Sequence, residues 1–178
     1  MTDALQIAVA RAARIRLMIF DVDGILTDGS LHYGPEGESL KTFNVHDGLG
    51  LKLLRQSGVA TAIITARNSP ILAKRAADLA IDHVQQGAHD KKSALEQLLA
   101  KTGVPPESTG FIGDDWIDLP VLLRVGFSAS VASAHPEVRS RVHYVTQAGG
   151  GCGAARELCD FILRAKGNYE AALAPYLA

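Results

Sequence analysis

Short apolar runs alternate with helical patterns along most of this sequence. The runs at 16–20, 59–64 and 109–112 carry mainly apolar side chains and end abruptly at polar residues, as buried strands do. Weaker runs of the same kind lie at 81–84, 127–131 and 143–145. Because strand and helix patterns follow one another in steady rotation, the sequence predicts an α/β fold with a doubly wound parallel sheet.

Capping residues mark the expected helix boundaries. Asp47 is placed to cap a helix that stops at Gly58, and Ser69–Pro70 has the pattern of an N-cap and a first helical residue. Asp90 is placed to cap a third helix, and a fourth is expected at 117–124. These helices supply the crossover connections that parallel strands require.

One segment breaks this rhythm directly after the first strand. Residues 30–43 alternate as strands on either side of the turn-rich Gly34–Gly37, which predicts an inserted β-hairpin. Such a hairpin would project over the carboxyl edge of the sheet, where ligands bind in open α/β folds. The length predicts one domain over residues 1–178, with a C-terminal tail at about 167–178.

Charge and composition exclude several classes of protein. Lys and Arg number 18 against 19 Asp and Glu, so no basic field favours nucleic acid or an anionic membrane as a partner. No stretch approaches the ~18 apolar residues of a membrane span, and Arg11 and Arg14 interrupt the apolar start where a secretory signal needs an uncharged core. A cytoplasmic protein is therefore expected. Cys152 and Cys159 fit no zinc or redox spacing and are predicted to be small buried side chains on a helix face.

Polar side chains that can carry chemistry follow the predicted strands in one order. They are Asp21 and Asp23 after the first strand, Thr65 after the second, Lys91 at a helix start, and Asp114 with Asp115 after the third. Parallel strands place their carboxyl ends on one edge, so these groups should converge. Several carboxylates in one crevice repel each other, and a hard divalent cation relieves that repulsion. A few carboxylates completed by water suit Mg²⁺.

With a metal present, the roles follow from the needs of phosphoryl transfer. Asp21 can attack phosphorus to form an aspartyl-phosphate, and Asp23 on the same side can serve as general acid and base. Lys91 and Thr65 can neutralise and bind the transferring phosphoryl oxygens. Each feature alone has an ordinary explanation, such as a turn, a calcium loop without its later ligands, a strand-end hydroxyl or a solvated lysine. Together, and each at an element boundary, they indicate a phosphatase.

These residues resemble the motifs of the haloacid dehalogenase superfamily. Asp21–Asp28 is similar to its first motif, Ile63–Thr65 to its second, Lys91 to its third, and Gly113–Asp115 with Asp118 to its fourth. The resemblance implies that Asp21 is the nucleophile and Asp23 the acid/base. It also implies a Mg²⁺ ion held by Asp21, the backbone carbonyl of Asp23 and Asp114, with Asp115 as an additional partner.

Further segments resemble the branch of this superfamily that acts on sugar-acid phosphates. They are Leu26–Gly29, the hairpin, Phe43–Gly48 and Gly149–Ala154. That branch lacks a large cap domain and forms homotetramers in which hairpins pack together and a neighbour helps to close each site near a subunit interface. Two departures stand out: Ala66 replaces the usual glycine of the second motif, and Trp116 precedes Asp118 where a tryptophan commonly follows the last acid.

The substrate implied by this resemblance is a small-molecule sugar-acid phosphate, the phosphate ester of an eight-carbon sugar acid from the pathway to lipopolysaccharide. Arg67 is the best candidate to bind its carboxylate, because a guanidinium forks onto two oxygens. Asn44 and Asp47 follow the hairpin and are placed to contact sugar hydroxyls, although Asp47 can equally serve as a helix cap. Gly24, Thr65, Ala66 and Lys91 complete the expected binding set.

Three alternatives to the eight-carbon sugar acid remain open. One is a nine-carbon sugar acid, although Ala66-Arg67-Asn68 differs from the Glu-Lys-Asn-like sequence of the relatives that act on such acids. Another is a different sugar phosphate. The third is a non-catalytic assembly domain, which the presence of Asp21, Asp23 and Lys91 disfavours.

Overall fold

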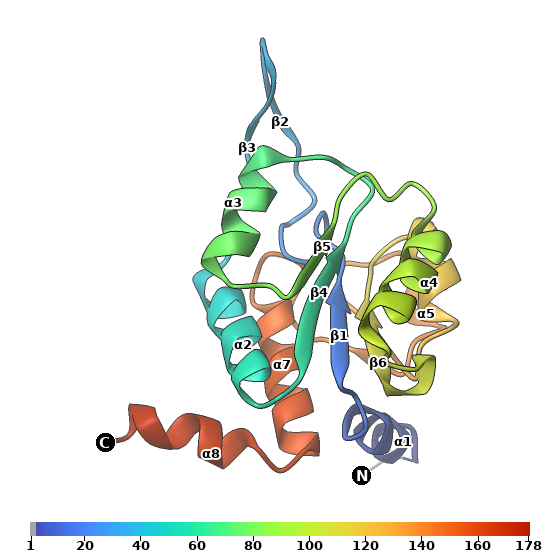
Figure 1. Ribbon diagram of the computed structural model, residues 1–178, viewed down its shortest axis with the longest axis vertical. Helices are drawn as coiled ribbons and strands as arrows, with labels where there is room; N and C mark the ends of the chain where they lie inside the picture. The colour runs from blue at the N-terminus through green and yellow to red at the C-terminus, as the bar shows by residue number, and fades with distance from the viewer. Residues whose placement is uncertain (1–2) are drawn as a thin grey trace.

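A parallel sheet runs through the centre of the computed structural model, which describes residues 3–178 (Figure 1). Its six strands lie in the order β5-β4-β1-β6-β7-β8, and every adjacent pair is parallel. The strands are β1 Leu17–Phe20, β4 Ala60–Ile64, β5 His83–Gln85, β6 Thr109–Ile112, β7 Phe127–Ser130 and β8 Tyr144–Val145. Because β1 lies between β4 and β6, its carboxyl end is the switch point where ligands bind in such sheets.

Helices cover both faces of the sheet. One face carries α1 Asp3–Ala12, α2 Val45–Gln56, α3 Pro70–Asp78 and α7 Ala154–Ala165. The other carries α4 Lys91–Thr102, α5 Leu119–Leu122 and α6 Pro136–Arg139. Consecutive strand residues alternate between the two cores, as Phe20 and Ile19 do, so the central strands are apolar throughout. The predicted doubly wound fold is confirmed.

Two of the predicted helix starts are confirmed. The Ser69 hydroxyl accepts the N–H of Leu72 at the start of α3, with Pro70 as first residue, and the Asp90 carboxylate accepts the N–H of Ser93 at the start of α4. These caps fix the ends of the loops that lead out of β4 and β5. Lys91 is therefore held at the first position of its helix.

The predicted cap of α2 is wrong. The helix begins at Val45, and the N-cap is Asn44, whose side-chain oxygen accepts the N–H of His46. Asp47 is buried in the first turn and instead accepts the N–H of Arg156 in the first turn of α7, at 2.8 Å. The reason lies in α7, which starts after Gly153 without a side-chain cap of its own and so needs an outside acceptor.

The expected 117–124 helix is divided in two, and the C-terminal tail is helical. The 3-10 turn η2 Trp116–Asp118 precedes α5, because Pro120 favours the first turn of a new helix over the interior of a longer one. The tail folds into α8 Tyr169–Leu173 and the 3-10 turn η3 Ala174–Tyr176, and a further 3-10 turn, η1 Pro106–Ser108, precedes β6. Cys159 is buried as predicted, whereas Cys152 is exposed.

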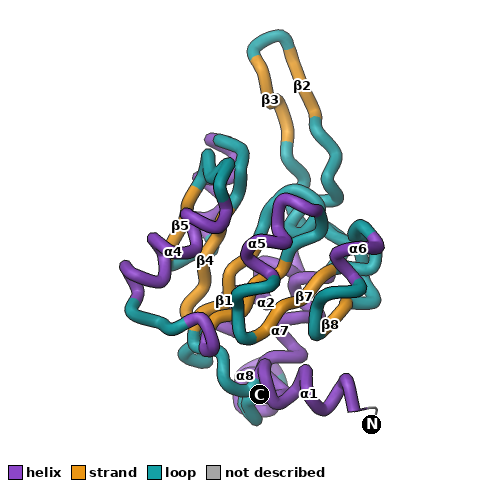
Figure 2. The backbone as a smooth tube through the Cα atoms, turned by 90° about the vertical axis from the view of Figure 1, so that its right-hand side faces the viewer, coloured by secondary structure: helices purple, strands orange, loops and turns teal. Residues whose placement is uncertain are grey.

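The predicted hairpin is present between β1 and α2. Its strands, β2 His32–Gly34 and β3 Gly37–Leu40, pair antiparallel around a tight turn. Gly37 has a φ of +111°, a conformation that favours glycine. The hairpin stands clear of the sheet layer, at the opposite end of the molecule from α1 and α8 (Figure 2). Within residues 3–178 it is the insertion that follows β1, and no large cap domain is present.

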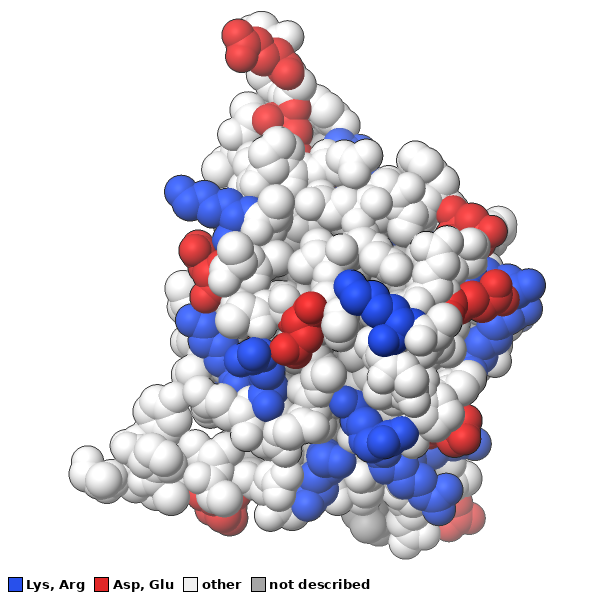
Figure 3. All heavy atoms as spheres, in the orientation of Figure 1, with Lys and Arg blue, Asp and Glu red and all other residues white. Residues whose placement is uncertain are grey.

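The surface carries both signs of charge. On the face in Figure 3, Lys and Arg side chains are interspersed with Asp and Glu, and the tip of the hairpin is acidic. Among the helices formed by residues 3–178, none is long and apolar enough to cross a membrane.

Candidate active site

The first motif forms a tight turn at the carboxyl end of β1. Asp21 follows the last strand residue, and its N–H donates to the carbonyl of Ile112 on β6 at 3.0 Å. Gly24 closes the turn with a φ of +89°, and a Cβ there would lie 2.2 Å from Oδ2 of Asp114. Residue 24 must therefore be glycine for the Asp114 carboxylate to approach the turn.

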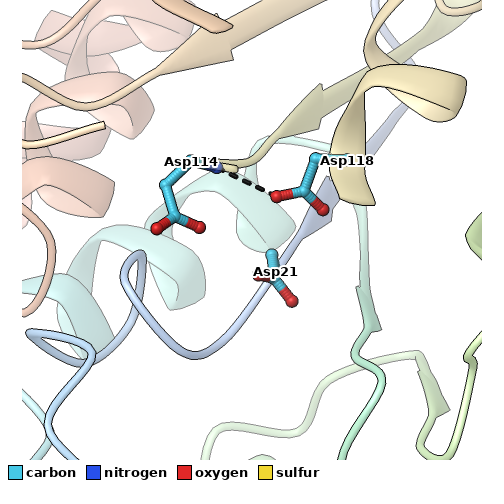
Figure 4. Close-up of side chains that lie close together, drawn as sticks. All are labelled: Asp21, Asp114 and Asp118. Carbon is cyan, nitrogen blue, oxygen red and sulfur yellow. Dashed lines mark hydrogen bonds between the residues drawn. The ribbon is translucent and has the colours of Figure 1, made fainter. Parts of the chain in front are cut away.

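Three carboxylates converge on this edge of the sheet (Figure 4). Asp21, Asp114 and Asp118 each place an oxygen within 4.8 Å of the others. Oδ2 of Asp118 accepts the N–H groups of Asp114 and Asp115, at 3.0 and 3.3 Å. Gly113 makes this possible, because a Cβ there would lie 2.4 Å from Cγ of Asp118. The turn after β6 is thus folded around the carboxylate of Asp118.

Lys91 joins two of these carboxylates. Its ammonium lies 2.8 Å from Oδ1 of Asp21 and 2.6 Å from Oδ1 of Asp118, and its side chain is almost fully buried. Burial opposes the charge on Lys91, but the two carboxylates outweigh it and raise the pKa of the lysine. Lys91 is therefore a fixed positive charge beside Asp21.

One lysine does not neutralise the cluster. Burial, and then the charge of Asp118, raise the pKa of Asp21 to about 7. Burial, Asp118 and Asp115 raise the pKa of Asp114 to about 7 as well. Both carboxylates are thus hard oxygen donors with a shortage of positive charge, which is the environment that a Mg²⁺ ion fits. Asp118 has both oxygens engaged by donors already.

Asp23 lies outside this cluster, at the base of the hairpin. Its Oδ1 is paired with Lys41, and its Oδ2 is 3.7 Å from Nε of Arg67. Arg67 also donates a hydrogen bond of 2.5 Å to the hydroxyl of Tyr33 on β2. The candidate acid/base and the candidate carboxylate-binding arginine are therefore next to each other.

Thr65 lies where predicted, at the end of β4 beside β1. Its side chain is buried, its N–H donates to Gln85 of β5, and its carbonyl accepts the N–H of Ala88. Half-buried Ala66 leads from it to Arg67. This loop thus presents its second-motif residues at the same edge as Asp21.

The other predicted site residues are engaged elsewhere. Asp115 is exposed, and its carboxylate accepts the N–H of Trp116, which caps η2. Asn44 caps α2 and its amide donates to the carbonyl of Gly151, at 3.4 Å. Asp47 binds the start of α7. These contacts give the three residues structural roles.

The glycine-rich segment supports the first-motif turn. A Cβ on Gly150 would lie 1.8 Å from the carbonyl oxygen of Gly24, and the N–H of Gly151 donates to Ile25 at 2.9 Å. This glycine-rich segment therefore packs on the turn that holds Asp21.

Sequence reasoning missed Lys41 and Glu38 and left Asp118 without a role of its own. The acidic character and spacing of Asp118 were visible, but the choice between it and Asp115 depends on the 3-10 turn that turns one carboxylate inward. Lys41 gave no signal, because a lysine at the end of an exposed hairpin is ordinarily solvated.

Comparisons with known proteins agree with this geometry. A profile of the haloacid dehalogenase-like hydrolase family matches residues 71–156. The 3-deoxy-D-manno-octulosonate 8-phosphate phosphatase of Yersinia pestis is 49% identical over 92% of this chain and 88% of its own.

Two solved structures extend the similarity to the whole fold. A probable YrbI family phosphatase from Pseudomonas syringae has a TM-score of 0.95 at 48% identity, over 97% of this chain and 98% of its own. The 3-deoxy-D-manno-octulosonate 8-phosphate phosphatase of Moraxella catarrhalis, in complex with magnesium, phosphate and KDO, has a TM-score of 0.92 at 42% identity, over 99% of each chain.

The chain belongs to the haloacid dehalogenase-like hydrolases. Within them, it is similar over nearly its whole length to the 3-deoxy-D-manno-octulosonate 8-phosphate phosphatases.

Proposed function

We propose that this protein is a Mg²⁺-dependent phosphatase that hydrolyses 3-deoxy-D-manno-octulosonate 8-phosphate. The observation that carries the proposal is that buried Asp21 and Lys91 and half-buried Asp114 meet at the switch point of the sheet. It occurs in a chain whose sequence is 49% identical to that of an enzyme named for this activity. The product would feed lipopolysaccharide synthesis, as the sequence resemblance implies.

The reaction proceeds in two displacements at phosphorus. A carboxylate oxygen of Asp21 attacks phosphorus, the ester P–O bond breaks, and the departing sugar oxygen takes a proton from Asp23. A water molecule then gives a proton to Asp23 and attacks phosphorus. The bond to Asp21 breaks, which releases phosphate and restores both carboxyl groups.

Lys91 and Thr65 act on the phosphoryl group. The ammonium of Lys91 lies 2.8 Å from Asp21, so it is positioned to stabilise negative charge on phosphoryl oxygens that approach this carboxylate. Thr65 offers a buried hydroxyl from the neighbouring strand end. Asp118 positions Lys91 through its Oδ1 and the turn of Asp114 through its Oδ2.

Asp21 and Asp114 would hold the Mg²⁺ ion, with the backbone carbonyl of Asp23 as a third protein ligand. When bound, the ion supplies positive charge for the phosphoryl oxygens and for the crowded carboxylates. The exposed position of Asp115 favours a role for it outside the direct ligands.

The sugar acid brings a second negative group, its carboxylate. Arg67 is half-buried beside Asp23 and is the cation best placed to bind it. Asn44 and Asp47 would need to leave their present partners to contact sugar hydroxyls, so their part in binding is weaker than that of Arg67. Gly24 and Ala66 contribute room rather than contacts.

We further propose a cytoplasmic homotetramer that assembles through the hairpin, with each site near a subunit interface. The support is apolar surface on and beside the hairpin, where Leu31, Tyr33 and Leu40 are 45%, 62% and 52% exposed. Light scattering at working concentration tests this assembly, and a monomer would exclude it.

Phosphate release with Mg²⁺ from a panel of esters tests the function. The panel contains octulosonate 8-phosphate, N-acetylneuraminate 9-phosphate, glucose 6-phosphate and p-nitrophenyl phosphate. We expect a strong preference for the first in kcat/KM. Preference for N-acetylneuraminate 9-phosphate would show that the proposed substrate is wrong and that a nine-carbon acid takes its place. Release from the nitrophenyl ester alone would support a phosphatase but not the proposed substrate. No release from any ester would favour a non-catalytic domain.

A further inference from the structure

A buried lysine sits at the base of the hairpin. Lys41 directly follows β3, and its side chain is only 2% exposed. Its ammonium is paired with Oδ1 of Asp23 and lies 3.2 Å from Oε1 of Glu38. A lysine in such a position keeps its charge only with close anionic partners. Lys41 thus joins the hairpin to the turn that follows β1.

The same polar network reaches the loop after β4. The Ser69 hydroxyl, which caps α3, donates to Oε2 of Glu38. Arg67, two residues earlier, faces Asp23 and donates to Tyr33. The hairpin is therefore connected both to the candidate acid/base and to the loop that carries the candidate substrate-binding arginine.

The two oxygens of Asp23 have different partners. Oδ1 meets the buried Lys41, whereas Oδ2 faces Arg67 at 3.7 Å, and the side chain of Arg67 is 36% exposed. A substrate carboxylate can draw the accessible arginine away from Oδ2. The buried lysine would still hold Oδ1.

We propose that Lys41 is a positioning residue that anchors Asp23 by Oδ1 and leaves Oδ2 to exchange protons with the leaving oxygen and with water. This proposal rests on the acid/base role proposed above for Asp23. Without the ammonium, the carboxylates of Asp23 and Glu38 would lose the cation that they share, and Arg67 would be the remaining cation beside Asp23. Asp23 would then turn toward Arg67 and lose its alignment with the leaving group.

The dependence of the rate on the leaving group tests this role. A misplaced general acid slows the departure of a basic leaving group and has little effect on a weakly basic one. We therefore compare kcat/KM for phenyl phosphate and p-nitrophenyl phosphate, because kcat/KM covers the steps up to aspartyl-phosphate formation. Neither ester has a carboxylate, so changes in the binding of a sugar-acid carboxylate cannot affect the comparison.

For Lys41→Met we expect kcat/KM for phenyl phosphate to fall on the order of 10-fold or more, which is within the range of general acid catalysis. Most of the kcat/KM for p-nitrophenyl phosphate should be retained. Lys41→Arg should recover part of the loss. Lys92→Met is the matched control, because within residues 3–178 the exposed side chain of Lys92 forms an ion pair only with Glu96, and its loss should leave both rates unchanged. Equal losses on both esters, or no loss on either, would overturn the proposal.

Circular dichroism and thermal unfolding establish that each variant is folded. If Lys41→Met does not fold, Glu38→Gln provides the second test, because it weakens the hold on Lys41 and keeps the contact with Asp23. For Glu38→Gln we expect a smaller fall in kcat/KM for phenyl phosphate relative to p-nitrophenyl phosphate. If the ratio of these two kcat/KM values were unchanged from the wild type, the role of Lys41 would be refuted. A wild-type protein that cleaves the aryl esters but not octulosonate 8-phosphate would reject only the proposed substrate.

Discussion

Neutralising the proposed nucleophile should stabilise the metal-free protein while it abolishes turnover. Asp21 is 4% exposed, and its environment raises its pKa from 3.8 to about 7. The folded protein therefore holds this proton more tightly than the unfolded chain does. The contribution of Asp21 to stability is complete below pH 3.8 and is lost as the pH rises through about 7.

The size of the effect follows from the shift. Above pH 7 the penalty covers about three pKa units, or roughly 4 kcal/mol at about 1.4 kcal/mol per unit. At pH 5 the unfolded carboxyl has passed its pKa by only about one unit, so the penalty is less than half of its value above pH 7. Asn keeps the shape of the side chain and remains neutral at both pH values.

Asp21→Asn should therefore exceed the wild type in unfolding free energy at pH 8 by up to about 4 kcal/mol, and by less at pH 5. The loss of one partner for Lys91 makes this figure a ceiling, although Asp118 remains at 2.6 Å. His143, whose pKa burial lowers, titrates in both proteins and cancels in the difference. An amide cannot attack phosphorus, so the variant should have no phosphatase activity.

Urea unfolding in EDTA at pH 5 and pH 8 measures both differences. Addition of Mg²⁺ at pH 8 should stabilise the wild type more than the variant, so the difference in unfolding free energy between the two proteins should become smaller. The reasoning would be refuted if Asp21→Asn were no more stable than the wild type at pH 8, or if its advantage did not grow between pH 5 and pH 8.

Three further substitutions test other parts of the site. Lys91→Ala should lower kcat on the order of 100-fold, since it removes charge from the transition state; an effect confined to KM would show ground-state binding only. Gly150→Ala should lower the free energy of unfolding in urea by about 1–3 kcal/mol and also lower kcat, because the new Cβ collides with the turn after β1. Gly149→Ala is the control and should be nearly neutral, because the nearest contact of its Cβ would be at 3.4 Å. Asp118→Asn should weaken both kcat and Mg²⁺ binding by calorimetry far more than Asp115→Asn, and equal effects would contradict the inward role of Asp118.

Much of the fold could be predicted because the strands are buried on both faces. Residues 17–20 are apolar at every position and residues 59–64 at every position except Thr61, which is typical of strands covered on both faces in a parallel sheet. The convergence of Asp21, Lys91 and Asp114 then followed from topology, since the carboxyl ends of β1 and β6 are adjacent. Chain order and burial pattern carry this information.

The assignments that failed depend on contacts between distant segments. Asn44 and Asp47 are both good caps on propensity, and the choice was made by α7, more than a hundred residues away, whose uncapped start takes the carboxylate of Asp47. The packing of Gly150 against Gly24 is of the same kind, since a glycine-rich segment is compatible with a hinge as well as with close backbone approach. Local pattern cannot choose between such alternatives.

The hairpin shows why this matters for function. Its apolar side chains Leu31, Tyr33 and Leu40 face solvent, while Glu38 of β3 and Lys41 at its base are bound to Ser69 and Asp23. A site that no cap domain covers must exclude water by other means. A hairpin that assembles at its outer surface and anchors Asp23 at its base would both help to exclude water and hold the acid/base in position. Assembly that shifts the hairpin would then move the anchor as well, so the proposed tetramer and the proposed acid/base geometry depend on the same two strands.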